Sequence, residues 1–410
     1  MRILLIIDGL YELFFSLQGE LLALGHEVYV LHLDPTYLKK AEGYAIEPLS
    51  GEVCDLVFTA NIFTSEGKHS VMSLLARYQI NCPIVNITLS HPVNEIEKLL
   101  HRFDKKKCNE IINDLKIIFW SPCEKATEEY RRLGFESIVS ASLGLSSKNY
   151  TLPFLRWNKP ETASKKMFHD NLTTSKKLGD RDFSNAEIIY MGVLPGKPDN
   201  LEPEVDLLAR SMVDISVADP TISRMDMEPF WSYIMSKDPV KQPEIWFILV
   251  NAYLYYHARA TRRVFVHRLK KEFGKRFLLI GDDWIKDNLD ADPTENILSR
   301  GQLYHNIPVS VDFGSLSLDT CFFPRPIEIV KNRGCLLSYR RYDSEHYFQE
   351  NADSLVFDNP DEMCEKVEIL LNSKETRDQC RDNIFNTFTQ KHGMRDSIVK
   401  VITKALSNTF

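Results

Sequence analysis

The sequence predicts an α/β protein of two domains, each built around a parallel β-sheet. Its 410 residues are too many for one ordinary hydrophobic core and fit two domains of roughly 150–200 residues. In both halves, short apolar runs alternate with segments of helical period, as expected for parallel strands joined by crossover helices. Hydrophobic residues make up 44% of the chain and charged residues 26%, which is an ordinary globular composition.

The first strand, helix and strand are predicted within residues 2–33. The run RILLIID suits a strand that is buried on both faces. The following segment ends at Gly25, a residue that commonly terminates helices. It carries leucines at helical spacing, namely Leu13, Leu17, Leu21 and Leu24. The run HEVYVLHL completes a βαβ unit, which implies a parallel sheet.

The same alternation continues to about residue 145. Further strands are expected at 55–60, 83–89, 115–121 and 137–144, and helices at 66–80, 91–103 and 123–134. Residues 1–145 are therefore predicted to form an amino-terminal Rossmann-like domain. The polar segment 146–185, with stretches such as SSKNYT and TTSKKLGDRD, is interpreted as a connection or insertion.

A second Rossmann-like domain is predicted over residues 186–385. Strands are expected at 186–192, 275–284, 307–314 and 335–340, and helical segments at 201–274, 326–334, 361–372 and 374–407. Residues 386–410 are expected to form a carboxyl-terminal helix that packs back on the amino-terminal domain.

Several protein classes are disfavoured by the sequence. The net charge of −7 gives no reason to expect a nucleic-acid partner. Neither half carries the GxGxxG of a dinucleotide-binding domain, and GVLPGKP departs from a P-loop in its spacing and in Pro198. No apolar run approaches the ~20 residues of a membrane helix.

The location suggested by the sequence is the cytoplasm. Asp8 and Gly9 interrupt the first apolar run, which favours a strand over a signal peptide. The eight cysteines are scattered without a CxxC pair and are interpreted as reduced thiols. The basic segment 258–276 could touch an anionic membrane surface peripherally, although such a segment is more often a solvated face.

The order of motifs in the second half resembles a known family. LLIGDDW, GQLYHNIPVSVDFG, RPIEIVKNRGCLLSY and VFDNPDEM follow one another within residues 275–400. This order resembles GT-B-fold glycosyltransferases of the CgeB-type (spore maturation protein-like) branch of the family-4-like group. In that branch an Arg, a Glu and a Gly precede a strand, and here these are Arg325, Glu328 and Gly334. The resemblance implies a GT-B fold, with two Rossmann-like domains facing each other across a cleft.

The resemblance also implies an activity. A hexosyltransferase-like glycosyltransferase would bind a nucleotide-sugar donor, a UDP- or GDP-sugar, mainly on the second domain. The first domain would bind a glycan, a lipid-linked glycan or a protein acceptor, with no nucleic acid involved. The expected setting is bacterial surface polysaccharide or glycoconjugate synthesis. No cofactor and no essential metal are expected.

A donor-binding site is predicted around Arg325 and Glu328. Pro326 suits the first turn of a helix, whose free N–H groups favour a diphosphate. Arg325 can add bidentate donors to phosphate. In the resembled family the glutamate that matches Glu328 holds the nucleotide ribose. From its local sequence alone, Glu328 could equally complement the helix dipole.

Other donor-binding candidates follow the ends of predicted strands. Lys197 is a candidate phosphate cation, although a surface lysine is the default interpretation. Gly192 and Gly9 would let the backbone approach a ligand closely. Tyr304 could lie near the nucleotide base, or it could pack in the core.

Three residues are candidates for catalysis, and each has an alternative. His91 follows a predicted strand, where many GT-B enzymes carry a histidine close to the donor sugar, but it could be an ordinary loop residue. Asp8 could be the general base of an inverting enzyme or a helix cap. The family's usual first acid falls at Thr320, so the adjacent Asp319 is its candidate replacement. Retention and inversion both stay open.

A rival interpretation is a non-catalytic GT-B-like protein that binds a nucleotide sugar or a glycan. The missing acid at Thr320 favours it. A nucleotide-sugar epimerase or hydrolase on the same fold is a further alternative.

Overall fold

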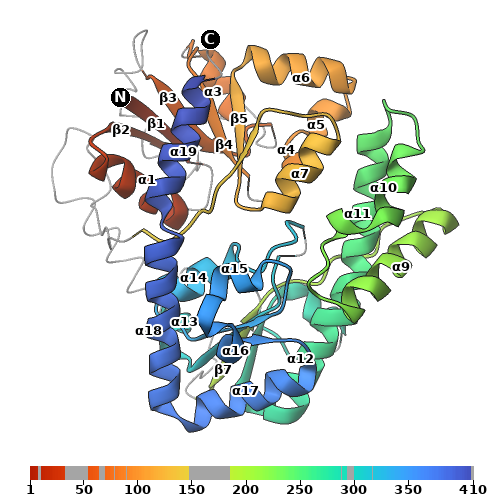
Figure 1. The fold of residues 1–410 in the computed structure, drawn as a ribbon, viewed down its shortest axis with the longest axis vertical. Coiled ribbons are helices and arrows are strands. Elements are labelled where there is room, and N and C mark those ends of the chain that lie inside the picture. Colours follow the sequence, from red (N-terminus) through yellow and green to blue (C-terminus); the bar gives the residue numbers. More distant parts are fainter. Residues whose placement is uncertain are drawn as a thin grey trace. The chain divides into compact units, whose positions relative to one another are not determined.

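A computed structural model describes residues 1–7, 11–32, 54–63, 70–77, 79–88, 90–146, 185–287, 289–292, 300–315 and 317–407. The chain divides into two compact units (Figure 1). Unit 1 comprises Met1–Leu152, Asp238–Glu244 and His392–Phe410. Unit 2 comprises Pro153–Lys237 and Ile245–Lys391.

Unit 1 is built on a six-stranded sheet in which all pairings are parallel and the strand order is β2-β1-β3-β4-β5-β6. The strands are β1 (Arg2–Ile7), β2 (Glu27–His32), β3 (Leu56–Ala60), β4 (Ile84–Ile87), β5 (Ile117–Ser121) and β6 (Ile138–Ser140). Ile3 of β1 lies between Val28 and Leu56 of the neighbouring strands. Every residue of β3, β4 and β5 is buried, which explains why these strands are apolar without alternation.

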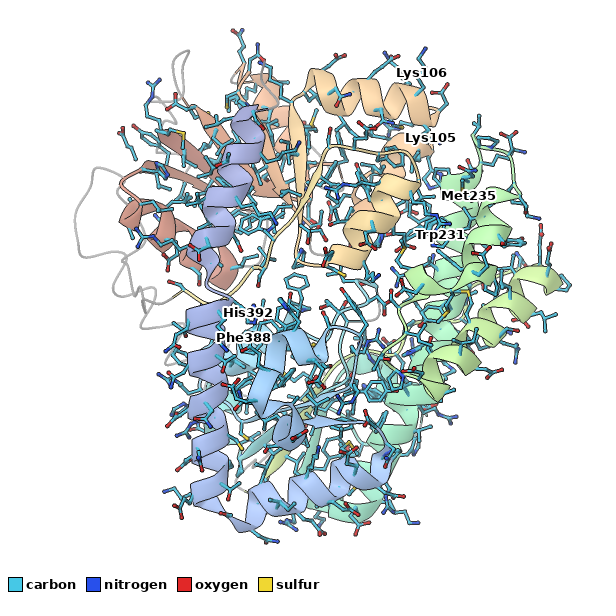
Figure 2. All side chains as sticks on the ribbon, in the orientation of Figure 1. Lys105, Lys106, Trp231, Met235, Phe388 and His392 are labelled. Atoms are coloured by element: carbon cyan, nitrogen blue, oxygen red, sulfur yellow. The ribbon has the colours of Figure 1, made fainter. Side chains whose placement is uncertain are left out.

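Helices join and cover this sheet. They are α1 (Tyr11–Ala23), α3 (Val71–Arg77), α4 (Pro92–Glu95), α5 (Glu97–Leu100), α6 (Lys105–Asp114), α7 (Glu124–Arg132) and α19 (Met394–Ser407). The last of these comes from the far end of the sequence and runs beside α1, as Figure 1 shows in dark blue. The backbone at Leu145 pairs with Gly393, just before α19 (the labelled His392 marks this point in Figure 2).

Unit 2 is built on a five-stranded sheet, again with parallel pairings, in the order β11-β10-β9-β7-β8. Its strands are β7 (Ile188–Met191), β8 (Phe277–Ile280), β9 (Val309–Asp312), β10 (Leu336–Tyr339) and β11 (Val356–Phe357). The chain passes from β7 to β8 on one side and then returns to place β9 on the other side of β7. The strand order therefore reverses between β7 and β9.

A large helical segment separates β7 from β8. It contains α9 (Pro203–Ala218), α10 (Glu228–Met235), α11 (Gln242–Ala258), a π-helical turn (Arg259–Arg263) and α12 (Val264–Phe273). Trp231 and Met235 lie one turn apart on α10 (Figure 2), and the tryptophan is buried while the methionine is exposed.

The later helices of unit 2 alternate with its remaining strands. They are α13 (Arg300–Asn306), α14 (Arg325–Lys331), α15 (Ser344–Phe348), α16 (Ala352–Leu355), α17 (Pro360–Asn372) and α18 (Lys374–Lys391). Phe388 of α18 stacks on Phe322 with ring centroids 3.5 Å apart, and both rings contact Tyr347. This aromatic cluster supports the segment that leads into α14.

The predicted fold class is confirmed, because each unit is an α/β unit with a parallel sheet. The expected arrangement of the two across a cleft stays a prediction. Several details of the prediction were wrong. The helix expected at 91–103 is broken at Ile96 into α4 and α5. The helices α6, α13, α15 and α16 and the short strand β11 were not expected.

In the described part of the chain, no helix has both the length and the apolar character needed to cross a membrane. The basic segment 258–276 carries several ion pairs, with Arg263 bound to Asp287 and Arg276 bound to Glu187. Within the described residues, three of the eight Lys and Arg side chains of this segment, Arg263, Arg268 and Arg276, are thus paired with carboxylates. All eight cysteines are free thiols.

Candidate functional site

A cavity of about 210 Å³ lies in unit 2 at the carboxyl ends of β7 and β9. Open parallel sheets bind ligands at this edge, where the strand order reverses. The cavity walls come from the loop after β7, the end of α11, the π-helical turn and the segment between β9 and α14. They are Val193, Pro195, Leu254, Arg262, Gly314, Ser315, Ser317, Phe323, Pro324 and Arg325.

The loop after β7 begins at Gly192, and only a glycine fits there. A Cβ atom at this position would lie 2.2 Å from the hydroxyl oxygen of Tyr190. The Gly192 carbonyl also accepts a hydrogen bond from Nε1 of the buried Trp284, at 2.7 Å. These two constraints at Gly192 fix the path of the following residues, including Val193 and Pro195, which line the cavity.

Arg262 joins this loop to the loop after β9. Its Nη1 donates to the Val193 carbonyl at 3.2 Å, and its Nη2 donates to the Gly314 carbonyl at 2.6 Å. The residue is only 7% exposed, and its Nε finds no hydrogen-bond partner among the described residues. Burial lowers the pKa of Arg262, as do the charges of Arg325 and Arg341, and these effects outweigh the opposing effects of Tyr190 and Asp312.

Arg325, at the start of α14, forms a second cationic wall. Its Nη1 donates to Oδ1 of Asp312, the last residue of β9, which is 1% exposed. The other oxygen of Asp312 accepts from the Gly314 N–H at 2.7 Å. Burial is the largest single influence and lowers the pKa of Arg325, but Asp312, Tyr190 and Tyr304 together outweigh it and raise that pKa above its ordinary value. Arg325 is thus a neutralised cation, whereas the guanidinium of Arg262 donates to two backbone carbonyls, those of Val193 and Gly314.

The cavity wall formed by Gly314, Ser315 and Ser317 is supported by the nearby Asp319. This aspartate has a φ of 52° and is 4% exposed. It accepts hydrogen bonds from Ser223 Oγ, from the Arg224 N–H at 3.0 Å and from Arg341 Nη2 at 2.7 Å. Next to it, Thr320 donates to the buried carboxylate of Asp343. Asp319 therefore serves as a loop anchor in this structure, and its contact with a donor sugar stays a prediction.

His91 lies in unit 1 and is completely buried. It caps α4, with Nδ1 accepting from the Val93 N–H at 3.2 Å. Its Nε2 lies 2.8 Å from Oε2 of Glu129, which is also fully buried. Both ring nitrogens thus face protein groups, and a catalytic role for His91 stays a prediction.

The other predicted residues are distributed around the cavity or outside the described chain. Glu328 lies on the fourth residue of α14 and is not one of the cavity-lining residues. Lys197 is exposed two residues beyond Pro195. Tyr304 is 1% exposed, so a nucleotide base could reach it only after a rearrangement. Asp8 and Gly9 lie outside the described residues.

Arg262 was not predicted as a site residue, because the basic segment 258–276 in which it lies was interpreted as a solvated face. A signal was present in the spacing. Arg262 shares one helical face with Ala258, Phe265 and Leu269, and all three of these are buried. An arginine on an otherwise apolar helical face is expected to be buried, and this pattern distinguishes Arg262 from the neighbouring surface arginines.

Comparison with known proteins finds a family model that covers seven of the ten residues lining this cavity. Residues 259–402 match the family model described as glycosyl transferase-like. No curated protein gave a match. Solved structures that resemble the chain include a T4 phage BGT variant in complex with UDP-glucose, at 9% identity and a TM-score of 0.49.

Two further similar structures cover 99% of both chains, as that one does. A DNA-modifying β-glucosyltransferase is 9% identical, with a TM-score of 0.47. An α-glucosyltransferase in complex with UDP and DNA is 10% identical, with a TM-score of 0.42. Likeness at this level transfers neither substrate nor mechanism. Residues 259–402 are similar to the glycosyl transferase-like family model.

Proposed function

We propose that the protein is a glycosyltransferase that moves a sugar from a nucleotide-sugar donor to an acceptor. One observation carries the proposal. The cavity lies at the reversal of strand order in unit 2, and seven of its ten lining residues fall within the glycosyltransferase-like segment 259–402. Two of those seven are arginines, Arg262 and Arg325. A concave site with convergent cationic groups suits the diphosphate of such a donor.

The proposed chemistry depends on charge at the leaving group. When the bond between the sugar and the diphosphate breaks, negative charge develops on the departing phosphate oxygen. Positioned guanidinium groups stabilise that charge most effectively where water is largely excluded. We therefore propose that arginines of the cavity carry this role and that no metal ion is essential. Retaining and inverting mechanisms are both compatible with this arrangement.

The finer assignments belong to the same proposal. We propose a UDP- or GDP-sugar as the donor, bound by unit 2, with Glu328 holding the ribose and Lys197 approaching the phosphates. The acceptor, a glycan, a lipid-linked glycan or a protein, would bind unit 1. His91, Asp8 and Asp319 stay the candidates for catalytic or sugar-contacting groups. The proposed setting is bacterial surface polysaccharide or glycoconjugate synthesis in the cytoplasm, within the CgeB-type branch.

A thermal-shift screen of the full chain tests donor binding. UDP, GDP, CMP, dTDP and their sugar conjugates are compared for wild type, for Glu328→Ala, and for Glu368→Ala as an exposed control on α17. A ligand that binds the folded state alone raises the unfolding midpoint. We expect one nucleotide to stabilise wild type and the control, and Glu328→Ala to lose that response. If no nucleotide or conjugate stabilises wild type, the proposal fails.

Turnover separates the enzyme from the non-catalytic alternative. Release of nucleotide diphosphate from the best-binding donor is measured with and without candidate glycan acceptors. Acceptor-dependent release identifies a transferase. Tight donor binding without release in any combination supports a nucleotide-sugar-binding protein. The same assay with EDTA and with added Mn²⁺ tests whether a metal is essential.

A further inference from the structure

The π-helical turn between α11 and α12 is bound to the loop after β7. Two of its arginines donate to carbonyls of that loop: Arg259 to Pro195 at 3.2 Å and Arg262 to Val193 at 3.2 Å. Arg259 is further fixed by stacking on Tyr255, at 4.0 Å from the ring centroid. Turns of this kind insert an extra residue into a helix and are frequent at functional sites. Here the wide turn lets arginines three positions apart contact the same short loop.

Arg262 differs from Arg341 and Arg325 of unit 2 in the partners of its charge. Arg341 is paired with Asp319, and Arg325 is paired with Asp312. The hydrogen bonds of Arg262 go to two carbonyl oxygens, and no carboxylate lies within ion-pair distance of it among the described residues. Keeping a charge away from water is costly unless an opposite charge accompanies it. Since Arg262 also lines the cavity, an anion that occupies the cavity would supply the missing partner.

We infer that Arg262 is the residue that binds the anionic part of the cavity's ligand, and that it ties this binding to the positions of the two loops it bridges. This inference rests on the proposed function, in which the anion is the diphosphate of a nucleotide-sugar donor. Arg325, in contrast, mainly positions α14 against β9 through Asp312. In this inference the residue that binds the anion is Arg262 and not Arg325, the arginine of the sequence motif.

The geometry also predicts which substitutions fail. A guanidinium presents five N–H donors in a rigid plane, so it can hold Val193 and Gly314 and still attract an anion. A lysine keeps the charge but has a compact ammonium that cannot bridge both carbonyls in the same way. Arg262→Lys should therefore keep part of the electrostatic attraction and lose the fixed loop geometry. Arg262→Gln should lose the charge altogether.

Calorimetric titration of the full chain tests the inference with UDP, UMP and inorganic pyrophosphate as probes. The variants are Arg262→Gln, Arg262→Lys and, as a control on the same helical run, Arg268→Gln, whose charge is paired with Glu272 and Asp361. We expect Arg262→Gln to weaken UDP by roughly 10- to 100-fold, as for a lost charged hydrogen bond, and to weaken UMP less. The salt dependence of UDP binding should become shallower in that variant. Arg262→Lys should retain the salt dependence with reduced affinity, and the control should match wild type.

The outcomes distinguish the inference from the function on which it rests. If wild type and a folded Arg262→Gln bind UDP equally, with the same preference over UMP, the inference is wrong and the proposed donor site stands. If pyrophosphate binds in an Arg262-dependent way while no nucleotide binds, Arg262 is an anion site and the nucleotide-sugar function is wrong. If wild type binds neither pyrophosphate nor any nucleotide, both are wrong.

A second measurement needs no variant and covers the case in which both Arg262 variants unfold. Hydrogen exchange of wild type is followed with and without UDP. Because Arg262 contacts both loops, bound UDP should protect the backbone amides of 192–196 and of 313–315 from exchange together. UDP binding that protects neither segment overturns the inference.

Discussion

Arg325, the first residue of α14, donates a hydrogen bond to the buried carboxylate of Asp312, the last residue of β9. The carboxylate is 1% exposed and also accepts from the Gly314 N–H, so one side chain joins a strand end, a loop and a helix start. This pair explains why an arginine stands at the start of α14 independently of any ligand.

Removing one partner of this pair should destabilise unit 2. In Asp312→Asn, the guanidinium of Arg325 would stay largely buried without its opposite charge. A cost of about 3 kcal/mol in the free energy of unfolding is expected for such a break. Urea denaturation of Asp312→Asn, Arg325→Met and the double variant gives the coupling energy between the two residues. Strictly additive effects of the two substitutions would show that the pair contributes no net interaction.

The buried His257 predicts a loss of stability at mildly acidic pH. Burial lowers its pKa well below the ordinary value, and the charges of Arg341 and Arg262 lower it further. As the pH falls through about 6.5, His257 is therefore protonated in the unfolded chain but stays neutral in the folded chain. Below that pH, and down to the pKa of the folded state, this group should remove up to about 1.4 kcal/mol of stability per pH unit.

Unfolding curves of wild type and His257→Leu between pH 7.5 and 5 test this expectation. The variant should have a flatter profile than wild type in this range. His101→Gln, at a histidine whose side chain is 66% exposed, is the matched control and should leave the profile unchanged. Parallel profiles for His257→Leu and wild type would contradict the prediction.

Gly192→Ala should be destabilising because of a defined steric conflict. The new methyl group would lie 2.2 Å from the hydroxyl oxygen and 2.6 Å from Cζ of Tyr190. Overpacking of this kind typically costs about 1–3 kcal/mol. Tyr190→Phe alone should be close to neutral, because its buried hydroxyl has no hydrogen-bond partner among the described residues. In thermal denaturation, the double variant should recover only part of the loss, since Cζ remains.

Phe388→Ala should weaken both stability and ligand binding. Its ring, labelled in Figure 2, stacks on Phe322, which directly precedes the cavity-lining Phe323. Truncating a fully buried phenylalanine typically costs about 3–5 kcal/mol. Phe388→Leu should cost less because it leaves a smaller void. A loss below 1 kcal/mol in chemical denaturation of Phe388→Ala would show that the stack contributes little.

The two parallel sheets were predictable from the amino-acid sequence alone. Strands of a parallel sheet are buried on both faces and therefore consist of continuous apolar runs. Runs such as RILLIID and LLSY could for this reason be assigned as strands. The helix covering them could be assigned from leucine spacing, and the start of α14 from its prolines. The break at Ile96 and the two-residue strand β11 escaped prediction, because short elements carry too few residues for a period to be detected.

Only the tertiary structure decided which charged residues face one another. Arg262 and Arg325, which both line the cavity, lie 63 positions apart, and no local pattern in the sequence indicates that they lie close together. The partner of His91 is Glu129, which comes from a helix 38 positions further along the chain, and no local pattern in the sequence indicates this pairing. The physical reason is that local periodicity reports what a segment buries. The partner of a charge depends on which strand ends and helix starts the sheet order brings together.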